Sequence, residues 1–589
     1  MPPISTKTDK PKDTKGSLIR LLSYMFEHKI GLICAVFLSL GGNVLALTGP
    51  AVSGKAIDII GKGKGNVDFD KIYVYVGILI GIYILSGIMT YALSVLMIRI
   101  GRSISKKMRQ EVFDKLTKLP VGYFDKNQTG DIISRVSYDI DVINTSVSAD
   151  ITQIITSIIT IVGSFGMMLY ISRELIPVVL ITLPVAIIYT RVMTKKTRPL
   201  FRARSKKYGE LNGYAEEMFS GQKTIQAYAN EQNVIGKFDN INVAAADAYY
   251  NADYYGAIIG PSVGFINNIS LALVAVAGSV LYLHNMVTIG QISSFVLYSR
   301  KFSGPVNEIA NMYNEILSAL AAAERVFNLL DENEEPKDGY EANALTNVKG
   351  RVEFKNVYFG YTPEKTIIEN FSLDVEPGKV VAIVGPTGAG KTTLINLLMR
   401  FYDVSSGQIL LDGTDIRDIK RNDLRKAFTM VLQDTWLFGG TIAENIAYSR
   451  PDATIDDIKR VARHARISFH INNLKKKYDT VISEDGGNLS KGQKQLMTIA
   501  RAMLIESKLL ILDEATSNVD TRTEKEIQKA MLELMKDKTC FIIAHRLSTI
   551  ENADVILVIK DGKVVEQGNH NELMKKREVY YNMYMSQFD

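Results

Sequence analysis

Cysteine is scarce in this sequence, and neither sign of charge dominates it. Only two cysteines, Cys34 and Cys540, occur among 589 residues, far apart and in unlike surroundings. This disfavours a disulfide framework and fits a reducing compartment. The formal net charge of +6 is too small to indicate a nucleic-acid partner. The first twenty residues are polar and lysine-rich, and no apolar core with a small-residue cleavage site follows them, so we predict no signal peptide.

Hydrophobic residues are abundant, at 47% of the chain, although 22% of the residues are charged. Both fractions fit if an apolar half and a polar half share one chain. A bilayer is spanned by roughly 20 consecutive apolar residues. Six such runs together disfavour a soluble helical bundle and predict an all-α transmembrane domain of six helices. The runs are Ile30–Leu47, Ile72–Ile98, Ile151–Ile171, Leu175–Met193, Tyr255–Leu283 and Val287–Leu317.

Basic residues indicate how these runs are oriented. Lysines and arginines cluster after the second and fourth runs, in residues 99–118 and 195–207, and the amino-terminal tail is also basic. Cytoplasmic loops carry such an excess, so the tail, both long loops and both ends of the domain are predicted to be cytoplasmic. Helical periodicity continues through both loops and predicts turns near Lys126–Asp131 and Glu210–Glu217. These turns would either dock onto a cytoplasmic domain or end solvated helical hairpins.

The acidic, turn-rich segment Asp331–Gly339 marks a boundary between two halves. Beyond it, short β-rich runs alternate with helical stretches, as in an α/β domain. The predicted fold is therefore multidomain, with the six-helix transmembrane domain followed by an α/β P-loop nucleotide-binding domain. Its predicted parts are a cytoplasmic tail (1–17), a transmembrane domain (18–330), a linker (331–345) and a nucleotide-binding domain (346–589).

The segment Gly385–Thr392 follows the apolar run KVVAIVG and fits the pattern G-x-x-x-x-G-K-[ST]. Glycines let the backbone wrap closely around phosphates, and a helix beginning near Lys391 directs its amino-terminal dipole at them. Lys391 would contact the β- and γ-phosphates and Thr392 would hold Mg²⁺. The strand before the loop and the helix after it make a chance match improbable, so we predict ATP and Mg²⁺ as cofactors.

Two acids, Asp513 and Glu514, end the apolar run in KLLILDEAT. The four apolar residues before Asp513 are typical of a buried parallel strand. At its carboxyl end, Asp513 suits Mg²⁺, and Glu514 is placed to polarise an attacking water. An acid pair after a strand can also merely cap a helix, but the phosphate loop upstream favours the catalytic interpretation.

Several motifs follow one another in a recognisable order: the phosphate loop, Gln433 in VLQDTWLF, the stretch LSKGQ (489–493), ILDEAT, SNVD (517–520) and His545 in IIAHRLS. This set resembles the ATP-binding-cassette family. The order of six spans and then a cassette resembles a half-transporter of the multidrug and lipid exporter type, over nearly the whole chain from about Leu18.

The resemblance implies roles for residues at matching positions. Tyr361 would stack on adenine, Gln433 would contact Mg²⁺ and the attacking water, His545 would contact the γ-phosphate, and Asp520 would shape the contact between two cassettes. Catalysis is then assigned to Glu514, His545, Lys391 and Gln433; nucleotide binding to Tyr361, Gly385, Thr387, Gly388, Ala389, Gly390, Lys391, Thr392, Thr393, Ser490, Lys491, Gly492, Gln493 and Asp520; and Mg²⁺ to Thr392, Gln433 and Asp513.

One cassette and six spans make half of such a machine. The resemblance implies that each ATP binds between the phosphate loop of one cassette and the LSGGQ-type stretch of another. Here Lys491 replaces the third-position glycine, which would permit closer approach and unusual dihedral angles. Exporters with one impaired site combine an intact glutamate, as at Glu514, with an altered stretch of this kind. We therefore favour a heterodimer with a chain of degenerate catalytic site over a homodimer that tolerates lysine.

The predicted function is ATP-driven export of lipophilic or amphipathic, multidrug-type substrates. The alternatives are an ATP-gated channel or regulator, and a membrane-anchored ATPase without transport. A channel is disfavoured because no long regulatory insert is seen and Glu514 is intact; an anchor would not need six spans. The absence of an organellar targeting sequence fits a bacterial plasma membrane, where the lipid bilayer and small lipophilic substrates would be the other partners.

Overall fold

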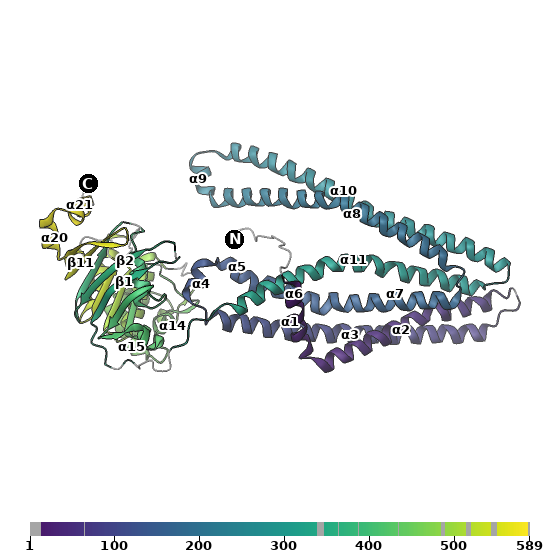
Figure 1. Ribbon diagram of the computed structural model, residues 1–589, viewed down its shortest axis with the longest axis horizontal. Coiled ribbons are helices and arrows are strands. Elements are labelled where there is room, and N and C mark those ends of the chain that lie inside the picture. Colours follow the sequence, from purple (N-terminus) through teal and green to yellow (C-terminus); the bar gives the residue numbers. More distant parts are fainter. Residues whose placement is uncertain are drawn as a thin grey trace. The chain divides into compact units, whose positions relative to one another are not determined.

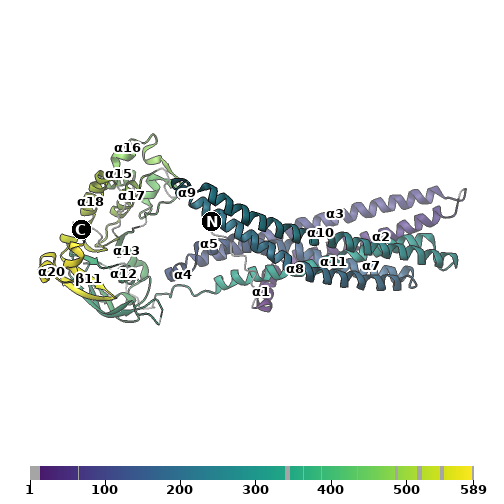
Figure 2. The ribbon, with the colours of Figure 1, turned by 90° about the horizontal axis from the view of Figure 1, so that it is seen from above.

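The computed structural model describes residues 13–63, 65–338, 345, 347–362, 364–386, 388–433, 435–483, 489–513, 520–543 and 550–586. The chain forms two compact units. The first combines Met1–Leu119 with Phe124–Glu334, and the second combines Pro120–Tyr123 with Glu335–Asp589. Figures 1 and 2 show that the first unit is helical and that the second contains both sheets and helices. The predicted fold class is confirmed.

Long helices dominate the first unit. The run from Thr129 to Ile171 is one continuous helical path that contains two short π-helical turns, η1 and η2. The elements of this part of the chain are α1 (Thr14–Phe26), α2 (Lys29–Ile60), α3 (Phe69–Leu116), α4 (Val121–Lys126), α5 (Thr129–Ser134), η1 (Arg135–Asp139), α6 (Ile140–Thr145), η2 (Ser146–Asp150), α7 (Ile151–Ile171), α8 (Ile176–Ser220), α9 (Gln222–Ala227), α10 (Glu231–Leu283) and α11 (Ile289–Asp331).

Five helical segments among the described residues are long and apolar enough to cross a membrane: Lys29–Ile60, Phe69–Leu116, Thr129–Ile171, Ile176–Ser220 and Glu231–Leu283. The sixth predicted span lies in α11, which is long but is not among the five. Arg300, Lys301 and Glu308 interrupt its apolar sequence. The helix α11 tolerates these polar residues because it packs along α2 and α7.

One of these polar residues completes the hydrogen bonding of a proline-containing helix. Pro50 lies inside α2 and has no backbone N–H, so the carbonyl of Ala46 loses its usual partner. The Nζ of Lys301 donates to that carbonyl oxygen at 2.8 Å. One turn away along α11, the hydroxyl of Tyr298 donates to the carbonyl of Leu47. Two turns away, Ser294 Oγ donates to the carbonyl of Pro50 at 2.8 Å. The polar face of α11 therefore bonds to α2 around the proline.

The prediction of a second cytoplasmic turn near Glu210–Glu217 was wrong. Glu210–Glu217 lies inside α8, which continues to Ser220 and ends at Gly221. Gly213 inside this segment costs about 1 kcal/mol of helix stability relative to alanine, but packing of α8 along α10 offsets this cost. Figure 1 shows the two helices side by side, with α9 at the turn between them. Near the first predicted turn, α4 ends at Lys126 and α5 begins at Thr129.

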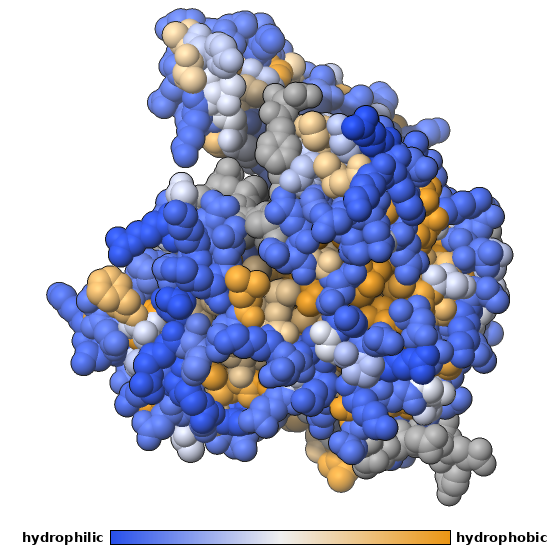
Figure 3. Space-filling view, turned by 90° about the vertical axis from the view of Figure 1, so that its left-hand side faces the viewer, coloured by the Kyte–Doolittle hydropathy of each residue, from blue (hydrophilic) through white to orange (hydrophobic). Residues whose placement is uncertain are grey.

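The long helices carry many exposed apolar side chains. Side chains such as Ile30, Ile188 and Leu283 are 80%, 60% and 79% exposed. Exposed apolar area on this scale is typical of a surface covered by lipid or by another protein. The face of the molecule shown in Figure 3 is different, being mostly hydrophilic with smaller hydrophobic areas.

The second unit is built on a six-stranded sheet of order β12-β11-β3-β10-β9-β6, in which β12 alone is antiparallel to its neighbour. A four-stranded antiparallel sheet has the order β2-β1-β4-β5, and β7 pairs with β8. The strands are β1 (Val352–Phe359), β2 (Ile368–Val375), β3 (Val380–Val384), β4 (Ser406–Leu411), β5 (Thr414–Asp415), β6 (Phe428–Val431), β7 (Gly440–Thr441), β8 (Val481–Ile482), β9 (Leu509–Asp513), β10 (Thr539–Ile543), β11 (Val555–Lys560) and β12 (Lys563–Gly568).

Helices lie between these strands, as parallel pairing requires, and two more follow the last strand. They are α12 (Lys391–Leu398), α13 (Arg421–Ala427), α14 (Ile442–Ala447), α15 (Ile455–His464), α16 (Ser468–Asn472), α17 (Lys491–Met503), α18 (Thr521–Met535), α20 (His570–Lys576) and α21 (Val579–Met585), with the 3₁₀ turns η3 (Ile416–Asp418) and η4 (Lys477–Asp479).

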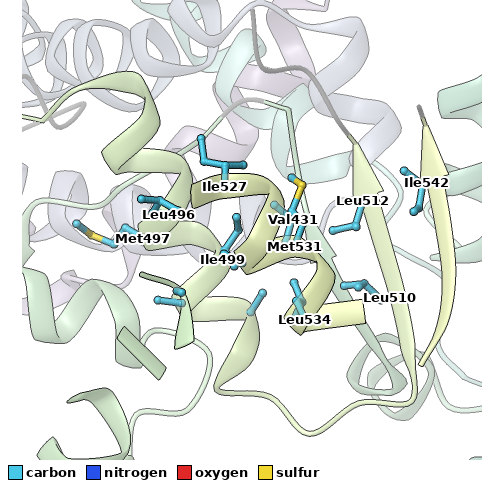
Figure 4. Close-up of a cluster of buried hydrophobic side chains, with 14 of the residues drawn as sticks. Val431, Leu496, Met497, Ile499, Leu510, Leu512, Ile527, Met531, Leu534 and Ile542 are labelled. Carbon is cyan, nitrogen blue, oxygen red and sulfur yellow. The ribbon is translucent and has the colours of Figure 1, made fainter. Parts of the chain in front are cut away.

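Alternate residues of the central strands face two separate hydrophobic cores. In β9, Leu510 and Leu512 pack into one core while Leu509 and Ile511 pack into the other. The first core contains side chains of α17 and α18, and Figure 4 shows them against the sheet. The second core contains α12 and the four-stranded sheet. The helix after the phosphate loop and α17 therefore pack on opposite faces of one sheet.

Candidate nucleotide site

The phosphate loop begins where β3 ends. Gly385, Gly388 and Gly390 have φ values of 154°, 83° and 102°, which glycine adopts without strain. At Gly385, a Cβ would lie 2.1 Å from the carbonyl oxygen of Ile559, so a larger residue does not fit. Gly390 is the residue before α12, so the first N–H groups of that helix adjoin the loop and favour an anion.

Lys391 is the first residue of α12, and its side chain folds back over the loop. Its Nζ donates to the carbonyl oxygens of Gly385 at 2.7 Å and Pro386 at 3.0 Å. Burial lowers the pKa of the Lys391 ammonium, while the nearby carboxylate of Asp513 partly counteracts this effect. The loop thus holds its cation in a buried position, where a phosphate would feel its charge strongly.

Asp513 and Gln433 reach the same edge of the parallel sheet. Ile543 of β10 pairs with Ile383 of β3 on one side and with Asp513 of β9 on the other. Asp513 is therefore level with the end of β3, two strand spacings or about 10 Å away. Val431, the last residue of β6, pairs with Leu512, and Gln433 follows two residues later with an exposed side chain.

Tyr361 lies just beyond β1 within a group of aromatic rings. Its ring packs edge-on against Phe359 and Tyr402, both with centroids 5.0 Å away. Its hydroxyl donates to Thr393 Oγ1 at 3.3 Å and accepts from Asn396 Nδ2 at 3.1 Å. These contacts tie the ring to α12. The residue is 40% exposed, which leaves part of it available to a planar ligand.

Ser490 precedes α17 and caps it. Its Oγ accepts from the backbone N–H of Gln493 at 3.3 Å, and the side-chain oxygen of Gln493 accepts from the Ser490 N–H at 3.1 Å. This reciprocal arrangement is a capping box. Lys491 is the first helical residue and is exposed. Its φ is not positive, so lysine fits at this position without the unusual dihedral angles that a glycine there would permit. Gly492 is buried behind it.

Comparison with known proteins identifies both units. Residues 32–306 match the model of the ABC transporter transmembrane region, and residues 368–517 match the ABC transporter model. A Mycobacterium tuberculosis relative, the fatty acid ABC transporter ATP-binding/permease protein, is 41% identical over 98% of this chain and 97% of its own. The chain belongs to the ABC transporter family.

Two further matches agree with this assignment. The ATP-dependent lipid A-core flippase of Escherichia coli is 33% identical over 98% of this chain and 99% of its own. A solved structure of a bacterial Atm1-family ABC exporter with ATP bound superposes with a TM-score of 0.75 at 28% identity, covering 95% of this chain and 98% of that one. The protein is thus an ABC exporter half-transporter, a multi-pass membrane protein whose ATPase is coupled to transport.

In this ABC transporter, Asp520 has a local structural partner as well as its predicted role at the cassette dimer. Its Oδ1 accepts from the backbone N–H of Thr523 at 2.9 Å and caps α18. That hydrogen bond holds the pKa of the exposed Asp520 carboxyl below its usual range. The cap fixes where α18 starts.

Arg501 was not predicted as a site residue, although it joins two parts of the cassette. Its Nε donates to the Asn445 carbonyl at 2.9 Å, and its Nη1 donates to the Trp436 carbonyl at 3.1 Å. The guanidinium also lies over the ring of Tyr448, 5.2 Å from its centroid. Burial lowers its pKa. Arg501 thereby links the end of α17 to the segment that follows Gln433. Its partners lie more than fifty residues away in sequence, so no local pattern indicated this role.

Three predicted site residues, Thr387, Glu514 and His545, lie outside the described residues. Among the described residues, no group of three or more His, Cys, Asp or Glu side chains could hold a metal. A Mg²⁺ bound mainly through ATP does not need such a group, because it takes few protein ligands. Thr392, Gln433 and Asp513 carry hydroxyl, amide and carboxylate oxygens, the donor types that Mg²⁺ prefers, so they fit the predicted ion.

Proposed function

We propose that this ABC exporter moves lipophilic or amphipathic, multidrug-type molecules across a bacterial plasma membrane by alternating access. The observation that carries the proposal is the separation of α12 and α17 onto opposite faces of the sheet. The phosphate loop of one chain would then use Ser490 and Gln493 of a second chain to complete its ATP site. Binding and release of ATP at that seam would drive the membrane helices.

Within the completed site, the residues divide the chemistry. Mg²⁺ would neutralise phosphate charge, and Thr392, Gln433 and Asp513 would hold it. Lys391 and His545 would stabilise charge on the γ-phosphate, while Glu514 would polarise the attacking water. Tyr361 would stack on adenine, with Asn396 and Thr393 fixing its ring.

The relatives narrow the substrate class. One is named for fatty acids and another for a lipid A-core. These lipids are amphipathic, which agrees with the small number of charged residues in the spans. We place the amino terminus and the cassette in the cytoplasm, following the basic residues at 99–118 and 195–207.

The partner that we propose is a different half-transporter with a degenerate catalytic site. Lys491 supports this choice, because its exposed side chain lies at the start of α17, where the nucleotide of a partner would bind. A lysine there adds bulk and charge beside the γ-phosphate without disturbing the cap of Ser490. We expect it to retain ATP while impairing hydrolysis at that site.

Transport into inside-out vesicles tests the proposal. Vesicles containing this chain and its partner should accumulate a labelled fatty acid or lipophilic dye when MgATP is supplied. Glu514→Gln should reduce both ATPase activity and uptake by at least a hundred-fold, and the lone chain should hydrolyse ATP poorly. ATP hydrolysis without uptake across a lipid and drug panel would favour an anchored ATPase, while full transport by the lone chain would contradict the heterodimer.

A further inference from the structure

A cavity of about 570 Å³ lies in the first unit where α2 begins and α3 passes it. Its polar lining includes Lys29 and Arg99, and its apolar lining includes Ile30, Leu96 and Ile100. We propose that this cavity binds an anionic phospholipid of the cytoplasmic leaflet. The phosphate would lie between the two cations, and the upper part of an acyl chain would cover the apolar side chains.

The level of the cavity along the helices supports a lipid. Lys29 is the first residue of α2 and is followed by the apolar run from Ile30. In α3, which packs along α2, the apolar run ends at Ile98 and basic residues begin at Arg99. Both helices therefore change from apolar to charged at the same level. Under the proposed orientation, this level is the cytoplasmic surface of the bilayer, which carries anionic lipids.

The charges around the cavity favour an anion. The one acid in the lining, Glu27, is paired with Lys107, whose Nζ lies 2.5 Å from Glu27 Oε1. Lys29 and Arg99 are exposed and form no ion pair with any side chain that the structure describes. The Nζ of Lys107 also lies over the ring of Tyr24, 5.3 Å from its centroid, and this contact holds the Lys107 side chain beside Glu27. Two positive charges thus remain uncompensated at the rim.

Gly31 helps to keep the cavity open. A Cβ at this position would lie only 3.0 Å from Cδ1 of Ile100, so a larger side chain would occupy the space beside α3. The cavity opens at the surface of the helices, where Lys29, Ile30 and Arg99 are exposed, and at this depth a lipid chain is the apolar material that can fill it.

Quenching by brominated lipids tests the site. The chain has one tryptophan, so Trp436→Phe combined with Ile33→Trp places a single reporter one helical turn from Ile30. In phosphatidylcholine vesicles, brominated phosphatidylglycerol should quench this reporter at several-fold lower content than brominated phosphatidylcholine. Lys29→Gln with Arg99→Gln should reduce the preference by about five-fold per charge, which corresponds to about 1 kcal/mol each.

Two variants separate this site from general surface charge. Arg102→Gln removes a nearby exposed cation that does not line the cavity and should change the preference by less than two-fold. Gly31→Phe keeps both cations but fills the cavity and should abolish the preference; circular dichroism of the same samples at 222 nm reports that each variant is folded. An equal loss of the phosphatidylglycerol preference in the Arg102 variant and in the Lys29–Arg99 double variant would overturn the proposal. Equal quenching by brominated phosphatidylglycerol and brominated phosphatidylcholine in the parent protein would also overturn it. Stronger quenching by brominated oleate than by phosphatidylglycerol would also overturn it.

Discussion

At Lys491, side-chain chemistry rather than backbone strain distinguishes this cassette from one with glycine at the same position. The residue begins α17 with ordinary helical dihedral angles, and the Ser490–Gln493 capping box is intact around it. A substitution at this position should therefore leave the fold in place and, under the proposed function, change only what a partner's nucleotide meets.

Replacing Lys491 by glycine measures that difference. Lys491→Gly should shift the unfolding midpoint by less than 2 °C, because an exposed first-turn residue contributes little to stability. If the ammonium impairs hydrolysis, ATPase activity of the lone chain should rise about ten-fold. Lys491→Met, which keeps the length but not the charge, is the matched control for bulk. Unchanged turnover in both variants would remove the support that Lys491 gives to a heterodimer.

The buried thiol of Cys540 gives a pH-dependent prediction. Burial raises the pKa of this thiol from 9.0 to about 12. Folding therefore favours the protonated form: the contribution to stability is constant below pH 9 and is lost as the pH rises from 9 towards 12. At pH 8 the folded thiol should be about a thousand-fold less ionised than the unfolded one.

Labelling in a Cys34→Ser background checks this directly. A disulfide reagent at pH 8 should leave native protein almost unmodified and should modify one thiol per chain after unfolding in detergent. Rapid labelling of the native protein would contradict the burial of Cys540 between β9 and β3.

At the scale of elements, Arg501 determines how α17 is joined to the segment after Gln433. Arg501→Ala removes hydrogen bonds to two backbone carbonyls and should lower the free energy of unfolding of the second unit by about 2–4 kcal/mol. The anisotropy of Trp436 fluorescence should fall, because the Trp436 carbonyl loses its donor. Arg501→Lys should recover only part of the loss, since an ammonium cannot reproduce the planar fork.

A matched control is Arg466→Ala, on the same unit. Arg466 forms an exposed ion pair with Glu526 at 3.4 Å, and such pairs contribute less than about 1 kcal/mol. A loss at Arg501 no larger than that at Arg466 would show that the bonds around Arg501 do not stabilise the cassette.

Elements differ in how far the sequence predicts them. The phosphate loop, the β9 strand and the start of α17 follow from local patterns, since glycine φ angles, an apolar run and a Ser-x-x-Gln cap each act within a few residues. The end of α8 could not be predicted from Glu210–Glu217, because packing along α10 outweighs the local cost of Gly213. The hydrogen bonds of Arg501 and Lys301 could not be predicted for a related reason: their partners, Asn445 and Ala46, are remote in sequence.

At the scale of the whole molecule, two units with separate cores predict two unfolding steps. Trp436 is the only tryptophan and lies in the second unit, so its fluorescence reports on that unit alone. MgATP at a hundred times its dissociation constant should stabilise this step by about 2.7 kcal/mol and raise its midpoint by several degrees.

The helical signal of the first unit should respond less to nucleotide. Circular dichroism at 222 nm, recorded in the same samples, provides the comparison, and Lys391→Ala should remove the shift in Trp436 fluorescence. A single transition seen equally by both probes would mean that the units unfold as one.

The bond between Lys301 and the Ala46 carbonyl has an electrical consequence. An ammonium among membrane-spanning helices lies within the transmembrane voltage, where moving one full charge across 100 mV involves about 2.3 kcal/mol. If α11 shifts along the bilayer normal during the cycle, a protonated Lys301 carries charge with it, and the resting potential of the cell then favours one conformation of the exporter over the other.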